Sequence, residues 1–109
     1  MTIQTLIDAG IFSLKVTGDP SKNISKVFCC DLLSIAMSKA PAEGAWVTVM
    51  GNKNTLAVAS LTDISCIILA EGIQLLPDDL ACAEREGITV FTTDLPIFDA
   101  ALKIQELFA

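Results

Sequence analysis

The chain has 109 residues, of which 52% are hydrophobic and only 18% are charged, and it contains no histidine and no tyrosine. A chain of this length fills one hydrophobic core and has no material for a second, so we expect a single domain over residues 1–109. Its net charge is −6, with the seven basic residues scattered along the sequence. This argues against nucleic-acid binding, because neutralising phosphates requires clustered cations.

No apolar run approaches the roughly 18 residues of a membrane span, and the N-terminus lacks a signal-peptide pattern. We therefore expect a cytoplasmic protein with no membrane contact. The four cysteines lie in or beside apolar segments, and without histidine they form no zinc set, so we expect buried thiols, no metal and no cofactor. A redox role of the adjacent cysteines at 29 and 30 is the alternative to buried, inert thiols. The cysteines are Cys29, Cys30, Cys66 and Cys82.

The first elements of the chain are a helix and a strand. Apolar residues at helical spacing after Thr2 predict a helix of two turns that ends at Gly10. Alternating apolar and polar residues over 11–16 are typical of a half-buried strand. Residues 21–26 are polar and predict an exposed loop.

Two strand-to-helix units follow. Residues 27–30 predict a short buried strand, and Asp31 is placed to cap the next helix. Residues 45–50 predict another strand from their β-branched and aromatic content. The helix after it is expected to be capped by Asn54 or Thr55.

The second half alternates helices and strands with short connections. The unbroken apolar run at 66–70 predicts the central strand of a sheet that is covered on both faces. A helix opens at Pro77 and ends at Gly87, a strand occupies 88–91, and a last helix begins near 94–96. This alternation predicts an α/β fold, a three-layer sandwich with a mostly parallel sheet.

The available side chains exclude most catalytic mechanisms. Without histidine there is no imidazole base, and the phosphate-loop and dinucleotide-binding glycine motifs are absent, so we expect no enzyme. Carboxylates remain as conceivable acids, bases or metal ligands. Most of them stand at predicted helix starts, where capping the free N–H groups explains them, and the ones at 63 and 99 suit solvated or turn positions. These carboxylates are Asp31, Asp63, Asp78, Asp79, Asp94 and Asp99.

The turn that follows the 45–50 strand is the candidate ligand site. It joins the C-terminal end of a strand to a helix N-terminus, where open α/β sheets bind their ligands, and Lys53 suits an anion or phosphate there. Asp31, after another strand, is expected to form a second wall. An ordinary capped turn is the alternative. The candidate residues are Gly51, Asn52, Lys53, Asn54, Thr55 and Asp31. We assign Trp46 to the core or to an interface.

Several segments, taken in order, resemble the DRTGG domain family. They are residues 14–18 (LKVTG), 30–34 (CDLLS), 46–49 (WVTV), 57–61 (AVASL) and 86–90 (EGITV). The resemblance covers nearly the whole chain and rests on the order and spacing of the segments, since the letters D-R-T-G-G themselves do not occur. It implies a fold similar to the N-terminal domain of HPr kinase/phosphorylase. The kinase chemistry of that protein belongs to a separate domain, so the resemblance does not imply kinase activity.

The resemblance also implies the kinds of protein with which such a domain occurs and the role that it has there. DRTGG domains occur alone or attached to phosphotransacetylase and to CBS-containing pyrophosphatases, and stand-alone members resemble those encoded beside iron-only hydrogenase genes in anaerobic bacteria. We expect a non-catalytic regulatory or ligand-sensing module that binds a small anionic or nucleotide ligand. The high apolar content predicts a homodimer. The alternative is an accessory subunit that binds a redox or phosphotransfer enzyme. An enzymatic role survives only through unpaired carboxylates and cysteines.

Overall fold

The computed structural model describes residues 1–108. The helices and strands, in chain order, are α1 (Ile3–Ala9), β1 (Ser13–Val16), β2 (Lys26–Cys29), α2 (Leu33–Lys39), β3 (Gly44–Thr48), α3 (Lys53–Thr62), β4 (Cys66–Leu69), α4 (Pro77–Glu86), β5 (Thr89–Thr92) and α5 (Ile97–Glu106). The boundaries predicted from the sequence are close to these. Within residues 1–108, no helix is long and apolar enough to cross a membrane.

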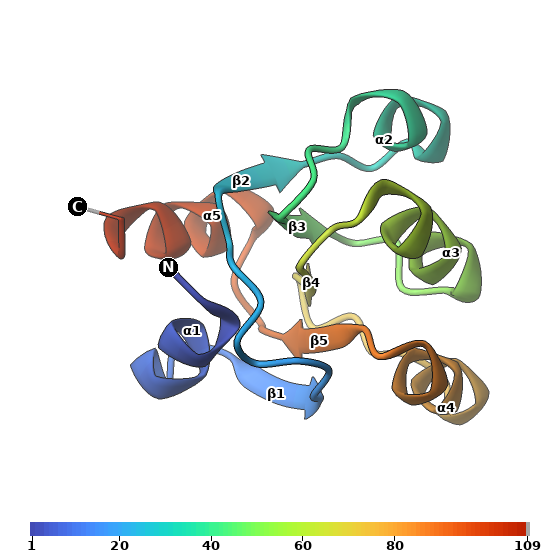
Figure 1. Cartoon of the computed structure of the whole chain (residues 1–109), viewed down its shortest axis with the longest axis horizontal. Helices are drawn as coiled ribbons and strands as arrows, with labels where there is room; N and C mark the ends of the chain where they lie inside the picture. Colours follow the sequence, from blue (N-terminus) through green and yellow to red (C-terminus); the bar gives the residue numbers. More distant parts are fainter. Residues whose placement is uncertain (109) are drawn as a thin grey trace.

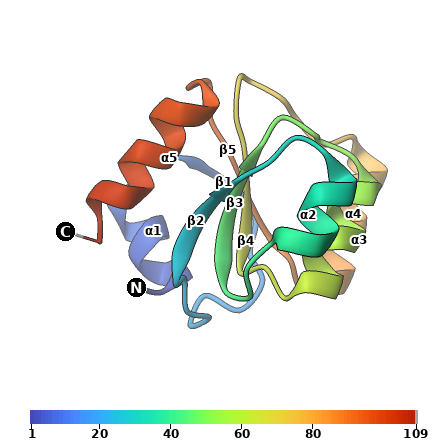
Figure 2. The ribbon, with the colours of Figure 1, turned by 90° about the horizontal axis from the view of Figure 1, so that it is seen from above.

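The strands form one five-stranded sheet in the order β1-β5-β4-β3-β2. β2, β3, β4 and β5 run parallel, and β1 pairs antiparallel with β5. Helices α2, α3 and α4 cover one face of the sheet, whereas α1 and α5 cover the other (Figures 1 and 2). The predicted three-layer α/β sandwich with a mostly parallel sheet is confirmed.

The central strands are buried on both faces. Every residue of β3, β4 and β5 is buried, and β4 is the middle strand, which confirms the prediction for 66–70. Alternate residues along these strands point to opposite faces. Trp46 and Ile67 therefore pack under α2 to α4, and Val47 and Ile68 pack under α1 and α5. Trp46 is a core residue, and its ring N–H donates to the carbonyl of Cys30 at 2.9 Å.

Helix termini follow the sequence signals with two exceptions. Thr2 caps α1 and Gly10 ends it in the left-handed region, as predicted. The cap of α3 is Asn52 rather than Asn54 or Thr55, because its side chain accepts hydrogen bonds from both of their backbone N–H groups. α2 is not capped by Asp31: its N-cap is Leu32, with no side-chain cap within the described chain.

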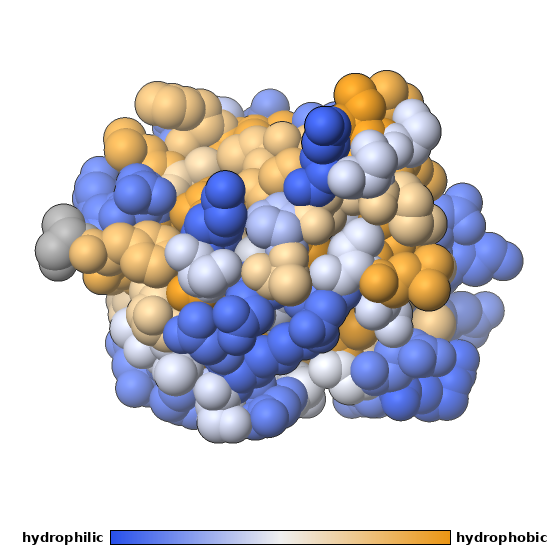
Figure 3. Space-filling view, turned by 45° about the horizontal axis from the view of Figure 1, so that its top comes forward, coloured by the Kyte–Doolittle hydropathy of each residue, from blue (hydrophilic) through white to orange (hydrophobic). Residues whose placement is uncertain are grey.

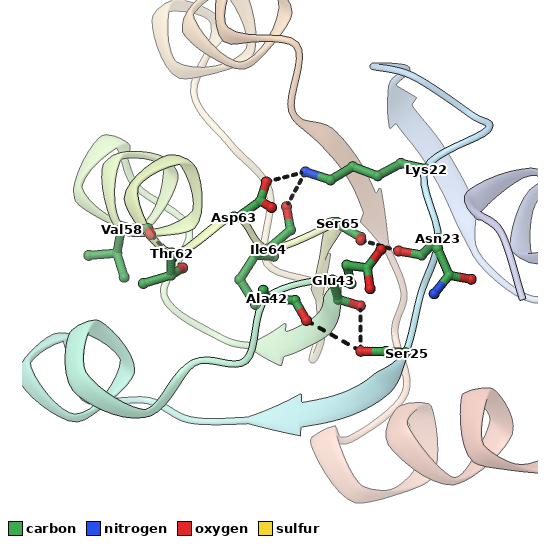
Figure 4. A network of polar contacts seen from close by, with 10 residues as sticks. All are labelled: Lys22, Asn23, Ser25, Ala42, Glu43, Val58, Thr62, Asp63, Ile64 and Ser65. Atoms are coloured by element: carbon green, nitrogen blue, oxygen red, sulfur yellow. Dashed lines mark hydrogen bonds and ion pairs between the residues drawn. The ribbon is translucent and has the colours of Figure 1, made fainter.

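The segment between β1 and β2 packs against the end of the sheet where the parallel strands begin, although the sequence predicted an exposed loop. Ile24 in this segment is completely buried. Lys22 donates to the carboxylate of Asp63 at 2.9 Å and to the carbonyl of Ile64 at 3.2 Å (Figure 4). The hydroxyl of Ser65 donates to the carbonyl of Asn23. The ion pair is partly exposed and contributes at most about 1 kcal/mol, so the buried Ile24 is the main anchor.

The turn after β4 holds a strained residue. Glu71 and Gly72 both have positive φ, 58° and 73°, and Ile73 N donates to Ala70 O at 3.1 Å. Such a turn needs two left-handed residues, for which glycine has no steric cost and glutamate does.

Replacing Glu71 by glycine is expected to raise the free energy of unfolding by about 1 kcal/mol, because the left-handed strain disappears. Urea denaturation monitored by circular dichroism measures the change. The control is Glu84→Gly in the last turn of α4, which should lower stability by a similar amount, because glycine is unfavourable in a helix. Destabilisation by Glu71→Gly would contradict the prediction.

Candidate functional site

The carboxyl ends of the four parallel strands meet at one edge of the sheet. From this edge the chain enters α3 after β3 and α4 after β4, so the two helix N-termini lie side by side. Between them is a cleft of about 720 Å³. Its walls are Asn52, Lys53, Asn54, Leu76, Pro77, Asp78 and Asp79. We call this site the α3/α4 cleft.

The two helices present different chemistry to the α3/α4 cleft. The side chain of Asn52 already occupies the N–H groups of Asn54 and Thr55 at the start of α3. α4 begins at Pro77 without a side-chain cap among residues 1–108, and Asp78 lies in its first turn. Pro77 has no N–H, and the N–H groups of Asp79 and Leu80 donate to the carbonyl of Leu76. Among the described residues, the N–H of Asp78 is therefore the one in the first turn of α4 that is left for a ligand, and it lies beside the carboxylates of the same turn.

The charges and the apolar surface of the cleft are close together. Lys53 supplies an ammonium group, whereas Asp78 and Asp79 supply two carboxylates. Leu76 adds apolar surface, and 70% of this residue is exposed. The cleft therefore favours a ligand with an anionic group, hydrogen-bond donors and an apolar part over a simple anion.

Three of the six candidate residues from the sequence line the cleft, namely Asn52, Lys53 and Asn54. Gly51 serves packing, because a Cβ there would lie 2.6 Å from the side chain of Ile73. Thr55 is 1% exposed, and its hydroxyl has no hydrogen-bond partner within the described residues. Neither Gly51 nor Thr55 lines the cleft.

Asp31 connects two strand ends instead of capping a helix. Its carboxylate accepts hydrogen bonds from the hydroxyl of Thr48 at 2.7 Å and from the N–H of Val49 at 3.0 Å. It lies at the same edge of the sheet as the cleft, after β2, but it is not among the residues that line the cleft. The contact with β3 accounts for a carboxylate at this position.

The α4 wall of the cleft is not predicted from the sequence. Asp78 and Asp79 were expected to cap a helix, and the α3 turn was expected to face the end of β2. β3 has two neighbours, β2 and β4, and the cleft forms on the β4 side. The available signal was Pro77 with two acids after the predicted central strand, since every such junction reaches the same edge of a parallel sheet.

The cysteines are less buried than predicted. Cys66 is buried, and burial raises its pKa to about 12. Cys29 is exposed, and Cys30 and Cys82 are half-buried, so the prediction of buried thiols is wrong for these three. Partial desolvation, and then the negative charge of Asp31, raise the pKa of the Cys29 thiol. A raised pKa disfavours the reactive thiolate, so the structure gives no support to a redox role for Cys29.

The fold is similar to that of a solved structure, although the sequence matches no known family. No family model and no curated protein matches the chain. It is similar to a crystal structure of the CBS and DRTGG domains from the regulatory region of Clostridium perfringens pyrophosphatase, complexed with the activator diadenosine tetraphosphate. The TM-score is 0.69 at 15% sequence identity, over 93% of this chain and 44% of that chain. The fold is DRTGG-like.

At 15% identity the likeness shows the fold of this DRTGG-like chain and not its ligand. The chain spans less than half of the regulatory region that it matches. Within residues 1–108, no three acidic or cysteine side chains come together in a way that could hold a metal ion.

Proposed function

We propose that this DRTGG-like domain is a non-catalytic regulatory module that senses a nucleotide in the α3/α4 cleft. The observation that carries the proposal is the composition of the cleft, whose walls contain Lys53, Asp78 and Asp79 together with the apolar Leu76 and Pro77. The similar solved structure is a regulatory region complexed with a nucleotide activator, which supports this class of ligand.

A nucleotide has a group for each wall of the cleft. Its phosphate suits the ammonium group of Lys53 and the backbone N–H of Asp78 at the start of α4. Its ribose hydroxyls are hydrogen-bond donors for the carboxylates of Asp78 and Asp79, as in other nucleotide sites of α/β sheets. Its base suits the apolar surface of Leu76 and Pro77. The volume of about 720 Å³ is in the range of small-molecule sites.

The cleft does not favour catalysis. The residues that line it are asparagine, lysine, leucine, proline and aspartate, with no serine, threonine or cysteine nucleophile beside a base. Binding without turnover is therefore the activity that we propose. A ligand that contacts both α3 and α4 stabilises the arrangement of the two helices that binds it. A sensor requires such a ligand-dependent shift between conformations.

Nucleotide binding is tested by thermal shift and calorimetry with mononucleotides, dinucleoside polyphosphates and inorganic phosphate. A nucleotide at a hundredfold its Kd should add about 2.7 kcal/mol to the stability of the domain. Lys53→Ala should weaken binding about tenfold, through the loss of roughly 1.4 kcal/mol of charge-assisted interaction. Lys39→Ala, at the end of α2, is the control and should bind like the wild type.

The aspartates separate nucleotide binding from simple anion binding. Asp78→Ala and Asp79→Ala should weaken the binding of a nucleotide, because its ribose loses acceptors, and should strengthen the binding of inorganic phosphate, because repulsion falls. Stronger nucleotide binding by both variants would contradict the assignment of the ribose. A panel without any thermal shift would overturn the proposed function.

The second candidate function is an accessory subunit that binds a redox or phosphotransfer enzyme. It is favoured by a shallow apolar groove between α3 and α4 that continues from the cleft, with Leu56, Ala57, Leu61 and Cys82 in its walls. Leu61 is 74% exposed there. Such exposed apolar surface is typical of protein-binding sites. A nucleotide screen without binding would favour this function over the first.

A further inference from the structure

β2 is an open edge of the sheet. It pairs with β3 on one side, and in Figure 2 its other side faces the viewer between α2 and α5. β3, β4 and β5 are completely buried, but β2 is exposed at Lys26 and Cys29 and only half-buried at Val27 and Phe28. An apolar strand with an unpaired side is a template for the addition of another strand.

The opposite edge of the sheet is protected against such pairing. β1 has a register shift between Leu14 and Val16, and Lys15 between them is exposed. Bulges and lysines are the features by which natural sheets block edge-to-edge association. β2 is regular along its register with β3, and its one lysine, Lys26, stands at the first position. Of the two edges, β2 is therefore the one suited to pairing.

The backbone of β2 also directs N–H and C=O groups away from β3, toward the open side of the strand. The carbonyl of Thr48 in β3 accepts a hydrogen bond from the β4 side. Successive carbonyl groups along a strand point to opposite sides, so the carbonyl of Ala45, three residues before Thr48, points toward β2. In the parallel register of β2 and β3, the N–H of Phe28 is the donor to this carbonyl. The backbone groups of the neighbouring Val27 and Cys29 consequently point out of the sheet.

Hydrophobic side chains flank this edge on both faces of the sheet. Leu32, Ile35 and Met37 are exposed at the start of α2 and along it. α5 packs against β2 and carries the exposed Phe98 and Leu102. Figure 3 shows hydrophobic surface over α2 and over α5, on the two sides of the edge. We call α2, β2 and α5 together the β2 edge surface.

The charges of the β2 edge surface suit a second copy of the chain. The chain has a net charge of −6, but the β2 edge surface, with the residues between β2 and α2, has three acids and three bases, namely Asp31, Asp99, Glu106, Lys26, Lys39 and Lys103. Two acidic copies therefore approach with less repulsion here than their net charges imply. The carboxylate of Asp31 is held by Thr48 and Val49 on the β3 side, so it does not lie between the two paired strands.

We propose that a second copy of this chain docks on the β2 edge surface, with β2 antiparallel to β2 across a two-fold axis perpendicular to the sheet. The axis passes near Phe28, and Val27 of each copy lies opposite Cys29 of the other, where their outward backbone groups form the ladder. The same axis brings α2 against α2 and α5 against α5, as an isologous interface requires. A stable interface buries about 800 Å² per partner, roughly a seventh of the 5447 Å² surface of the chain.

The oligomeric state tests the proposal directly. Light scattering at tens of micromolar protein should give twice the 11.6 kDa mass of the chain. Ile35→Glu should give the monomer mass, because it places a carboxylate in the contact of α2 with α2 across the proposed interface. Leu61→Glu, on the distant α3, is the matched control and should leave the dimer intact. Both residues are exposed in the single chain, so circular dichroism should show a folded protein for each variant.

Disulfide trapping tests the register independently. Opposed residues of an antiparallel hydrogen-bonded pair have Cα atoms about 5.5 Å apart, which a disulfide can bridge. Oxidation of Val27→Cys should give a covalent dimer through Cys29 of the other copy, and the double variant Val27→Cys/Cys29→Ser should not. A monomeric wild type, a dimer lost only in Leu61→Glu, or trapping that does not require Cys29 would each overturn the proposal.

Discussion

Gly18→Ala is expected to lower the free energy of unfolding by about 3 kcal/mol, a large part of the stability of a small domain. Gly18 follows the end of β1 and lies directly beside Gly87, which ends α4. The N–H of Gly18 donates to the hydroxyl of Thr89 at 2.9 Å. A Cβ at this position would overlap the carbonyl oxygen of Gly87 and lie 2.8 Å from the carbonyl carbon. Both are backbone atoms, so no side chain can move away to make room.

Gly10→Ala is the matched control for Gly18→Ala. Gly10 has a φ of 66° and no atom within 4 Å of an added Cβ, so alanine there has a conformational cost of about 1 kcal/mol without a steric clash. Urea denaturation of both variants measures the difference, with the slope of unfolding as the check that the denatured state is unchanged. Equal losses of stability in the two variants would show that the approach of Gly18 to Gly87 is not a tight contact.

Two buried threonines are expected to respond to valine with opposite signs. Thr48 is fully buried; its hydroxyl donates to the carboxylate of Asp31 and accepts from the N–H of Met50 at 3.2 Å. Thr48→Val removes both hydrogen bonds and should cost about 2 kcal/mol, since one of them is to a charged group. Thr55 is equally buried, but its hydroxyl has no partner among the described residues. Thr55→Val should therefore stabilise the domain by about 1 kcal/mol.

The threonine pair also tests the role of Asp31. Asp31→Ala should remove most of the difference between wild type and Thr48→Val, because the hydroxyl of Thr48 then has no carboxylate to bind. The coupling is measured by urea denaturation of the two single variants and the double variant. Additive effects of Asp31→Ala and Thr48→Val would contradict the hydrogen bond, and destabilisation by Thr55→Val would show that its hydroxyl is satisfied in solution.

Local patterns in the sequence are enough to predict the elements and the class of the fold. The unbroken apolar run at 66–70 predicted the central strand, and the structure has β4 in the middle of the sheet. Glycines at 10 and 87 marked helix ends, and both are left-handed caps. Such features are local, because the apolar spacing and the cap residues depend on hydrogen bonds and burial within one element. The same local patterns predicted the α3 wall of the α3/α4 cleft, which is Asn52, Lys53 and Asn54.

Which elements become neighbours depends on long-range packing. The strand order places α4 beside α3, which brings Asp78 and Asp79 to Lys53, and it places Asp31 against Thr48 instead of at the start of α2. It also makes β2 an edge, which exposes Cys29 although its sequence is typical of a buried strand. Strand order depends on contacts between residues far apart in the chain, and hydrophobic periodicity carries no information about which strand lies next to which.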